Sequence, residues 1–86
     1  MFSLKLSNSS KKFLKKCESE INQRIIKKIE MLNENPFPSN TMRVVNQKEK
    51  VFRVRIGKYR ITYVVFFEEK IIFISDIDKR SKIYNE

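Results

Sequence analysis

The chain has 86 residues, of which 19 are Lys or Arg and 10 are Asp or Glu, giving a formal net charge of +9. This length predicts one domain over residues 1–86, and no apolar run approaches the roughly 18 residues of a membrane span. Cys17 is the only cysteine, which excludes an intrachain disulfide and makes a reducing cytosol the expected compartment. This excess of basic residues favours binding to nucleic acid or to an acidic partner.

The first half of the chain predicts one strand followed by two helices. Residues 2–6 alternate apolar and polar side chains, which is typical of a strand with one face inward. The polar cluster at residues 7–10 offers an N-cap for a first helix, and Ser19 is the candidate cap of a second. The second helix has apolar side chains at helical spacing and ends before Pro36, because proline cannot continue a helix. We expect the two helices to be antiparallel and joined by a tight turn.

The second half predicts an antiparallel meander. Its strands are expected at residues 41–46, 51–56, 59–67 and 71–77, separated by a polar turn at 47–50, a hairpin turn at 57–58 and a tight turn at 68–69. The predicted fold class is therefore α+β, with an N-terminal strand, two antiparallel helices and a three- to four-stranded antiparallel sheet packed on them. The last two strands are apolar on both faces where they pair, so the outer face needs a cover, for which the tail at residues 78–84 is the candidate.

The central feature of the chain is a hairpin around Gly57, its only glycine. Apolar residues alternate with arginine on either side of a Gly-Lys loop, which favours a two-residue type II′ turn. That turn places Arg55 opposite Arg60 and Arg53 opposite Thr62. Because like charges opposite one another destabilise a sheet, three arginines on one face indicate that an anion binds there. The residues of the opposite, inward face are Phe52, Val54, Ile56, Tyr59, Ile61 and Tyr63.

The residue types exclude several kinds of catalytic site. The chain has no histidine, and its acids are not spaced as metal ligands, so we expect no metal site. A Ser-His or Cys-His nucleophile is excluded for want of histidine, and a single glycine excludes a glycine-rich phosphate loop. Glu68 and Glu69 fall in a predicted turn, where adjacent carboxylates are typical of a solvated tip. No cofactor is expected.

The positive charge is concentrated between Arg43 and Arg60, where seven basic residues stand against one acid. Two interpretations of the arginine face remain open on residue types alone. The arginines, joined by Arg80 if the tail packs over the sheet, can stabilise charge on a phosphoryl group. Alternatively, the face binds an acidic partner, which is the simpler interpretation. Tyr84 either joins a site near Arg80 or closes an edge of the core.

Two segments of the chain resemble the C-terminal half of the RelE/ParE toxin superfamily. They are the run at residues 52–63, which ends in Gly57 to Tyr63 (GKYRITY), and the segment Asp78 to Tyr84 (DKRSKIY). The order of predicted elements matches along the whole chain. The resemblance implies an endoribonuclease that cuts mRNA in the ribosomal A site, inhibits translation, and is held inactive by a cognate antitoxin. It also implies metal-free attack of the ribose 2′-hydroxyl on the adjacent phosphate.

The resemblance assigns roles to residues of this chain. The catalytic set of the family falls on Arg53, Arg55, Arg60, Arg80 and Tyr84. Arg60 and Arg53 are expected to stabilise the phosphate. Arg55 or Arg80 acts on the leaving-group side, and Tyr84 stacks on the nucleobase, with proton removal as a second candidate role. The predicted RNA and phosphate contacts are Arg43, Lys48, Lys50, Lys58, Lys79 and Lys82.

This chain also departs from the family pattern. RelE proteins favour lysine at the positions of Arg53 and Arg55, and arginine is the poorer general acid, so acid catalysis is shared with the ribosome or the enzyme is slow. The Glu-His pair of the YoeB-like branch is missing. The alternative function is a toxin-fold binding module without RNase activity, either a ParE-like gyrase inhibitor or an inactive antitoxin-binding protein. Because ParE-like proteins generally lack the basic and tyrosine set, Tyr84 favours the RelE branch.

Overall fold

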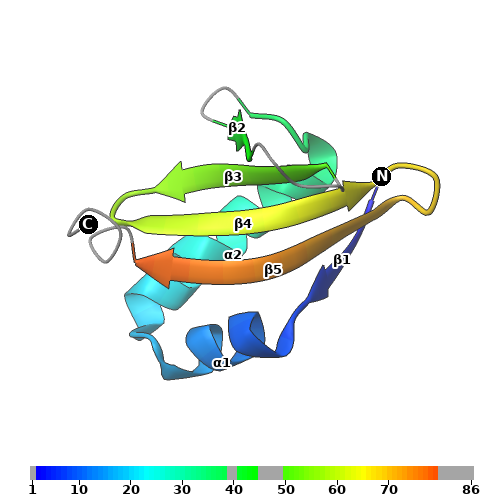
Figure 1. Ribbon diagram of the computed structural model, residues 1–86. Coiled ribbons are helices and arrows are strands. Elements are labelled where there is room, and N and C mark those ends of the chain that lie inside the picture. Colours follow the sequence, from blue (N-terminus) through cyan, green and yellow to red (C-terminus); the bar gives the residue numbers. More distant parts are fainter. Residues whose placement is uncertain (1, 39–40, 45–49, 80–86) are drawn as a thin grey trace.

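The computed structural model describes residues 2–38, 41–44 and 50–79, in which a five-stranded sheet carries both helices on one face (Figure 1). In chain order the elements are β1 (Ser3–Leu6), α1 (Asn8–Lys16), α2 (Ser19–Glu34), β2 (Thr41–Arg43), β3 (Val51–Ile56), β4 (Tyr59–Phe66) and β5 (Ile71–Lys79). The predicted α+β class and element order are confirmed. Neither helix in this part of the chain has the length and apolarity that a membrane span requires.

The sheet has the strand order β1-β5-β4-β3-β2. Strands β2 to β5 form the predicted antiparallel meander of four strands. The sheet is nevertheless mixed, because β1 pairs with β5 in parallel, from Ser3 opposite Ile71 to Leu6 opposite Ile74. The predicted N-terminal strand therefore extends the sheet and places the beginning of the chain beside its last strand.

Of the two predicted N-caps, the one of α1 is confirmed and the one of α2 is wrong. Ser7 caps α1, because its side-chain oxygen accepts a hydrogen bond from the backbone N–H of Ser10 at 3.1 Å. Ser19 does not cap α2. The N-cap is Glu18, which makes no side-chain capping bond, and Ser19 is the first helical residue. At the other end α2 stops at Glu34, before Pro36, as expected.

The hairpin has the register that its glycine predicts. Arg55 pairs with Arg60, and Arg53 pairs with Thr62. Gly57 has φ +59°, and no positive φ is recorded for Lys58, in agreement with a type II′ loop. Other strand ends differ slightly from expectation, since β4 ends at Phe66 and β5 runs on to Lys79. The strand predicted at 41–46 is seen at Thr41–Arg43, and its last two residues and the turn residues 47–49 lie outside the described part.

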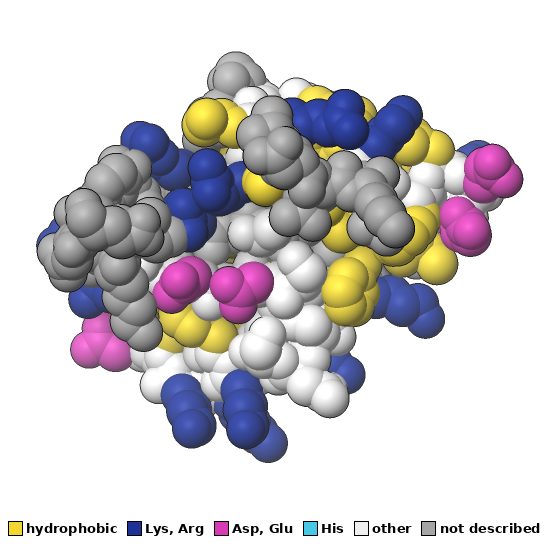
Figure 2. Space-filling model, in the orientation of Figure 1, with side chains coloured by type: hydrophobic (Ala, Val, Ile, Leu, Met, Phe, Trp, Pro, Cys, Tyr) yellow, Lys and Arg dark blue, Asp and Glu magenta, His cyan; other side chains and the backbone are white. Residues whose placement is uncertain are grey.

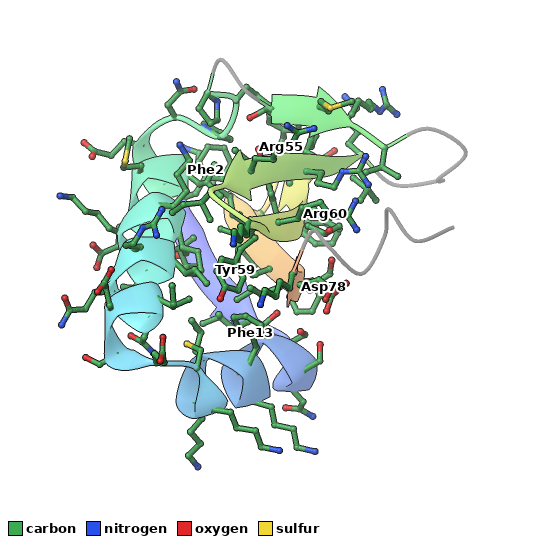
Figure 3. All side chains as sticks on the ribbon, turned by 90° about the vertical axis from the view of Figure 1, so that its left-hand side faces the viewer. Phe2, Phe13, Arg55, Tyr59, Arg60 and Asp78 are labelled. Carbon is green, nitrogen blue, oxygen red and sulfur yellow. The ribbon has the colours of Figure 1, made fainter. Side chains whose placement is uncertain are left out.

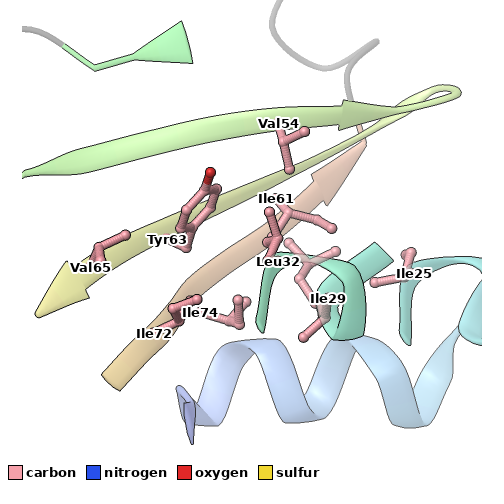
Figure 4. Close-up of a cluster of buried hydrophobic side chains, with 10 residues drawn as sticks. Ile25, Ile29, Leu32, Val54, Ile61, Tyr63, Val65, Ile72 and Ile74 are labelled. Carbon is pink, nitrogen blue, oxygen red and sulfur yellow. The ribbon is translucent and has the colours of Figure 1, made fainter. Parts of the chain in front are cut away.

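The core lies between the sheet and α2 (Figure 4). The inward face predicted for the hairpin is confirmed, because Val54, Ile61 and Tyr63 are fully buried. Tyr59 is half-buried on the same side and packs edge-on against Phe13 of α1. The buried hydrophobic residues are Ile25, Ile29, Leu32, Val54, Ile61, Tyr63, Val65, Ile72, Ile74 and Ile77. At roughly 1.5–3 kcal/mol for each large apolar side chain, this cluster is the main source of stability.

Candidate functional site

Three arginines share the face of the sheet that the helices leave open. Arg53 lies on β3 and Arg60 on β4, both half-buried, while Arg55 on β3 is exposed. The alternation of the strands fixes this arrangement, because the neighbours of each arginine along its strand point into the core. Figure 3 shows Arg55 and Arg60 on the side of the sheet away from α2. The three predicted strand arginines are therefore brought together.

Arg60 carries an unusual polar atom. Its Nε is buried and has no hydrogen-bond partner in the described structure. An unsatisfied buried donor costs about 1–3 kcal/mol, and such groups in folded proteins are often associated with function. Because this nitrogen is buried, the base of the guanidinium lies within the structure rather than in solvent.

The predicted RNA-contacting lysines and arginine are spread over several surfaces. Lys58 is exposed at the hairpin tip beside the arginine face. Lys79 and Arg43 are exposed, but they pair with Tyr59 and Phe52 and so lie by register on the helix side. Lys50 precedes β3 at the far end of the hairpin, where its Nζ lies 5.2 Å from the centre of the Phe67 ring. Lys48, Arg80, Lys82 and Tyr84 lie outside the described residues.

A bulge in β5 adds two carboxylates to the arginine face, which the sequence did not predict. The register shifts between Thr62 and Tyr63, where Thr62 pairs with Asp76 and Tyr63 pairs with Ile74, so Ser75 is an extra residue. A bulge changes the face to which the following residues point. Beyond it, Ile77 is buried and Asp78 pairs directly with Arg60.

Hydrogen bonds from both neighbouring elements hold the bulge in place. Ser75 Oγ donates to the Thr62 carbonyl on β4 at 3.1 Å. On the other side, Ser7 Oγ donates to the Ser75 carbonyl at 2.8 Å, and the buried Ser10 Oγ donates to the Ile74 carbonyl at 3.1 Å. The extra backbone groups of a bulge need partners outside the ladder, and the start of α1 supplies them. The position of the aspartates is thereby fixed.

The sequence carried one signal of this bulge. In the last strand the buried apolar residues are Ile72, Ile74 and Ile77, so the spacing of two changes to three at Ser75. Continued alternation would have placed both aspartates in the core, where unpaired charges are too costly. Figure 2 shows acidic side chains next to a group of basic ones on this side of the molecule.

The other half of the open face is apolar. Val64 and Phe66 on β4 share the face of the arginines, as predicted, and pair with Phe73 and Ile71 on β5. Phe66 is 38% exposed. A shallow cavity of about 440 Å³ runs along residues 64–69 and Lys50. The tail predicted to cover this half lies mostly outside the described residues.

A groove of about 660 Å³ lies between the end of β5 and α1. Its apolar wall contains Phe13 and Tyr59, whose ring centres are 5.8 Å apart. Its charged residues are Lys12, Lys16, Glu18, Asp76, Asp78 and Lys79. The described residues contain no group of three or more Cys, Asp or Glu that could hold a metal ion.

The fold and the basic open face define a class of small toxins with a RelE-like sheet. The isolated RelE toxin of Escherichia coli is similar in structure, with a TM-score of 0.79 and 20% identity over 99% of this chain and 93% of that one. RelE in its complex with RelB from Pyrococcus horikoshii matches with a TM-score of 0.83 and 21% identity, over 94% and 97% of the two chains. These similarities show the shared fold.

The sequence comparisons show the family. Residues 4–84 match the family described as the ParE toxin of the type II toxin-antitoxin system, parDE. The chain therefore belongs to this family, within the RelE/ParE superfamily. It is also 41% identical over 58 residues to RelE1 of Methanocaldococcus jannaschii. That alignment covers 65% of this chain and 64% of the relative, slightly less than two thirds of the relative's length.

Proposed function

We propose that this protein is the toxin of a type II toxin-antitoxin system and acts as a ribosome-dependent endoribonuclease that cuts mRNA in the A site. The observation that carries the proposal is the grouping of Arg53, Arg55 and Arg60 on the open face of a RelE-like sheet. A polyanion bound across these three arginines would screen the repulsion between the paired Arg55 and Arg60. Under this proposal the protein works in the cytoplasm, where its ribosomes are.

The proposed chemistry is an attack of the ribose 2′-oxygen on the adjacent phosphate, which leaves a 2′,3′-cyclic phosphate and a 5′-hydroxyl. Arg60 and Arg53 stabilise the charge that builds on the phosphoryl oxygens, because their guanidinium groups are placed before the substrate arrives. Arg55 or Arg80 acts on the leaving-group side, and Tyr84 stacks on a base. Arg80 and Tyr84 enter this set from the family resemblance alone.

The proposed partner is a cognate antitoxin. Structures similar to this chain include RelE-RelB complexes from Pyrococcus horikoshii and Escherichia coli. The open face of this chain fits a segment with two kinds of side chain, acidic ones over Arg53 and Arg60 and apolar ones over Val64 and Phe66. Such a segment would neutralise the arginines and cover the exposed apolar half in one contact.

A second candidate function rests on the family match. The matching family is that of parDE toxins. A ParE-like protein would bind gyrase, or would bind only its antitoxin, and would use the arginine face for an acidic protein surface. This alternative needs no catalytic group, so the two functions differ in what happens to RNA.

The deciding experiment adds the purified protein to an in vitro translation system and maps the mRNA ends. The proposed function predicts cuts in phase with codons, which appear only when ribosomes are translating. The cuts should carry 2′,3′-cyclic phosphate ends and should disappear with Arg60→Ala. Lys15→Ala is the matched control, because it removes one positive charge from an exposed site on α1, far from the open face.

Two results would reject this function. Intact mRNA in an inhibited system, together with DNA breaks that depend on gyrase, would establish the ParE-like alternative. Cleavage of naked RNA at the same rate as ribosome-bound RNA would also contradict it, because the proposed enzyme depends on the ribosome to orient its substrate.

A further inference from the structure

The two aspartates that the bulge places on the arginine face have no role in the proposed catalytic set. Asp78 faces Arg60 across the β4–β5 pair, and Asp76 faces Thr62. Side chains directly opposite in an antiparallel pair have Cβ atoms about 4.5–5.5 Å apart. Asp78 and Arg60 are therefore neighbours across the two strands, and Figure 3 shows both on the open side of the sheet.

Attack by a 2′-hydroxyl requires a group that takes its proton. The chain has no histidine, and a guanidinium keeps its proton in proteins. Lysine and tyrosine side chains also carry their protons at neutral pH. On the described part of the open face, the side chains that can accept a proton there are the carboxylates of Asp76 and Asp78.

The two carboxylates differ in ways that select Asp78. Asp78 is half-buried and pairs with Arg60, whereas Asp76 is exposed and pairs with Thr62, two residue pairs further along the ladder. The Oδ1 atom of Asp78 accepts a hydrogen bond from the backbone N–H of Lys79 at 2.8 Å. This bond fixes the carboxylate and leaves its second oxygen for a substrate, which is the arrangement that a general base needs.

We infer that Asp78 is the general base of the reaction, an inference that rests on the proposed endoribonuclease function. Its carboxylate takes the proton of the 2′-hydroxyl while O2′ forms a bond to phosphorus. The bond between phosphorus and O5′ breaks, and O5′ keeps the electron pair and takes a proton from water. Arg60 lies between the two negative groups, the carboxylate and the phosphodiester, and reduces their repulsion.

Several charged groups surround this carboxylate. Those that face it or share its groove are Arg60 on β4, Arg55 on β3, Asp76 and Lys79 on β5, Lys12 and Lys16 on α1, and Glu18 before α2. Cations outnumber acids in this set, so the local field attracts an RNA backbone toward the base.

The test is the single-turnover cleavage of mRNA on programmed ribosomes by Asp78→Asn, measured against pH. Asparagine keeps the oxygen that accepts the Lys79 N–H but cannot take a proton. We expect a loss of about 10²–10⁴-fold at neutral pH, and a rate that no longer declines at acid pH as the wild-type rate is expected to do. Asp76→Asn is the matched control and should keep both the wild-type rate and the acid decline.

Two further measurements distinguish a general base at Asp78 from a general acid and from a residue that only positions Arg60. An mRNA with sulfur in place of the bridging 5′-oxygen has a better leaving group, so it rescues a missing acid but not a missing base. In an Arg60→Lys background, Asp78→Asn should still reduce the cleavage rate by at least about tenfold, although the two neighbouring residues are coupled and their effects need not add. If that reduction vanishes, Asp78 only positions Arg60, and the assignment as base is wrong.

The outcomes also distinguish this inference from the proposed function. If the wild-type protein cuts no mRNA, the proposed function fails. If the wild type cuts and Asp78→Asn cuts equally fast, or if the sulfur substrate restores its rate, only the assignment of Asp78 fails. Should Asp78→Asn not fold, Asp78→Ala replaces it, and an active folded Asp78→Ala would equally overturn the inference.

Discussion

The two faces of the sheet are built from the same strands but follow different rules. On the helix side, Ile61 and Tyr63 are fully buried in a cluster of apolar side chains. On the open side, the alternate positions carry Arg60 and Thr62, and the buried Nε of Arg60 has no partner in the described structure. One face is therefore packed against the helices, while the other carries charged side chains on neighbouring strands.

In a small domain, the face that is packed and the face that is charged are expected to respond differently to mutation. A residue on the helix side should be exchanged only at a cost in stability, whereas a charged residue on the open side should contribute little to it. The open face should therefore tolerate mutation in unfolding experiments and fail in activity assays. The predictions below test that separation, beginning with the largest expected effect.

The largest effect is expected at the core. Ile61→Ala should lower the free energy of unfolding by about 2–5 kcal/mol, because it leaves a cavity between the sheet and α2. Its neighbour Thr62 points to the open face, and Thr62→Ala should cost less than about 1 kcal/mol. Urea unfolding of both variants measures the difference. Equal losses would show that the open face is also part of the core.

The second effect concerns activity. Under the proposed function, Arg60→Ala should reduce mRNA cleavage by about 10²–10³-fold, as expected when one group that stabilises the transition-state charge is removed. Its free energy of unfolding should fall by less than about 1 kcal/mol, because Arg60 lies on the open face between a like charge on Arg55 and an opposite charge on Asp78. The cleavage assay and thermal unfolding must be made on the same preparation. A variant that is both inactive and unfolded would contradict the separation of the two faces.

The third effect concerns the turn that sets which side chains belong to each face. Gly57→Ala should destabilise the protein by about 1–2 kcal/mol, because Gly57 has φ +59°, where an alanine is strained. The added Cβ would also lie 3.0 Å from Nη2 of Arg24, although this end of a flexible side chain can move. Lys58→Ala is the control and should leave the unfolding midpoint unchanged. A stabilised Gly57→Ala would mean that the turn has another conformation.

The smallest effect is expected for one hydroxyl of the core. Tyr63 donates a hydrogen bond to the carbonyl of Pro36, so Tyr63→Phe should cost about 1 kcal/mol at pH 8. Desolvation by burial raises the pKa of Tyr63 above 10.0, although a hydrogen bond with Thr41 lowers it in part. As the pH rises, the Tyr63 hydroxyl therefore loses its proton more readily in the unfolded chain than in the folded protein. The free energy of unfolding of the wild type consequently falls as the pH rises through 10.

Phenylalanine does not ionise, so only the wild type loses stability from this group. The difference in free energy of unfolding between the wild type and Tyr63→Phe should therefore become smaller above pH 10. Chemical unfolding of both proteins between pH 8 and pH 11 measures this gap. The other lysines and tyrosines titrate equally in both proteins and cancel in the difference. A gap that widens with pH would show that Tyr63 ionises more readily in the folded state than in the unfolded one.

Much of this structure follows from local patterns in the sequence. Alternation around Gly57 predicts the register of β3 and β4 and the grouping of Arg53, Arg55 and Arg60, because side chains in a strand point to opposite faces in turn. The amphipathic pattern predicts the face of α2 that lies in the core. These features depend on residues close together in the chain.

The features that were missed depend on distant residues. The parallel pairing of β1 with β5 leaves no local signature, because it joins segments separated by most of the chain. The bulge at Ser75 is held by Ser7 and Thr62, and neither partner can be identified from the sequence around Ser75. The N-cap of α2 is Glu18 instead of the predicted Ser19. Residue preferences for the N-cap position do not locate a helix start to within one residue.

The contact between β1 and β5 has a consequence for the synthesis of the protein. Ser7 and Ser75, which are joined by a hydrogen bond, are 68 residues apart, and contacts of such separation form late in folding. A nascent chain cannot place Asp78 beside Arg60 until β5 has left the exit tunnel and paired with β1 and β4. Under the proposed function, a ribosome that makes this toxin is therefore not exposed to an assembled active site while translation of the domain is still in progress.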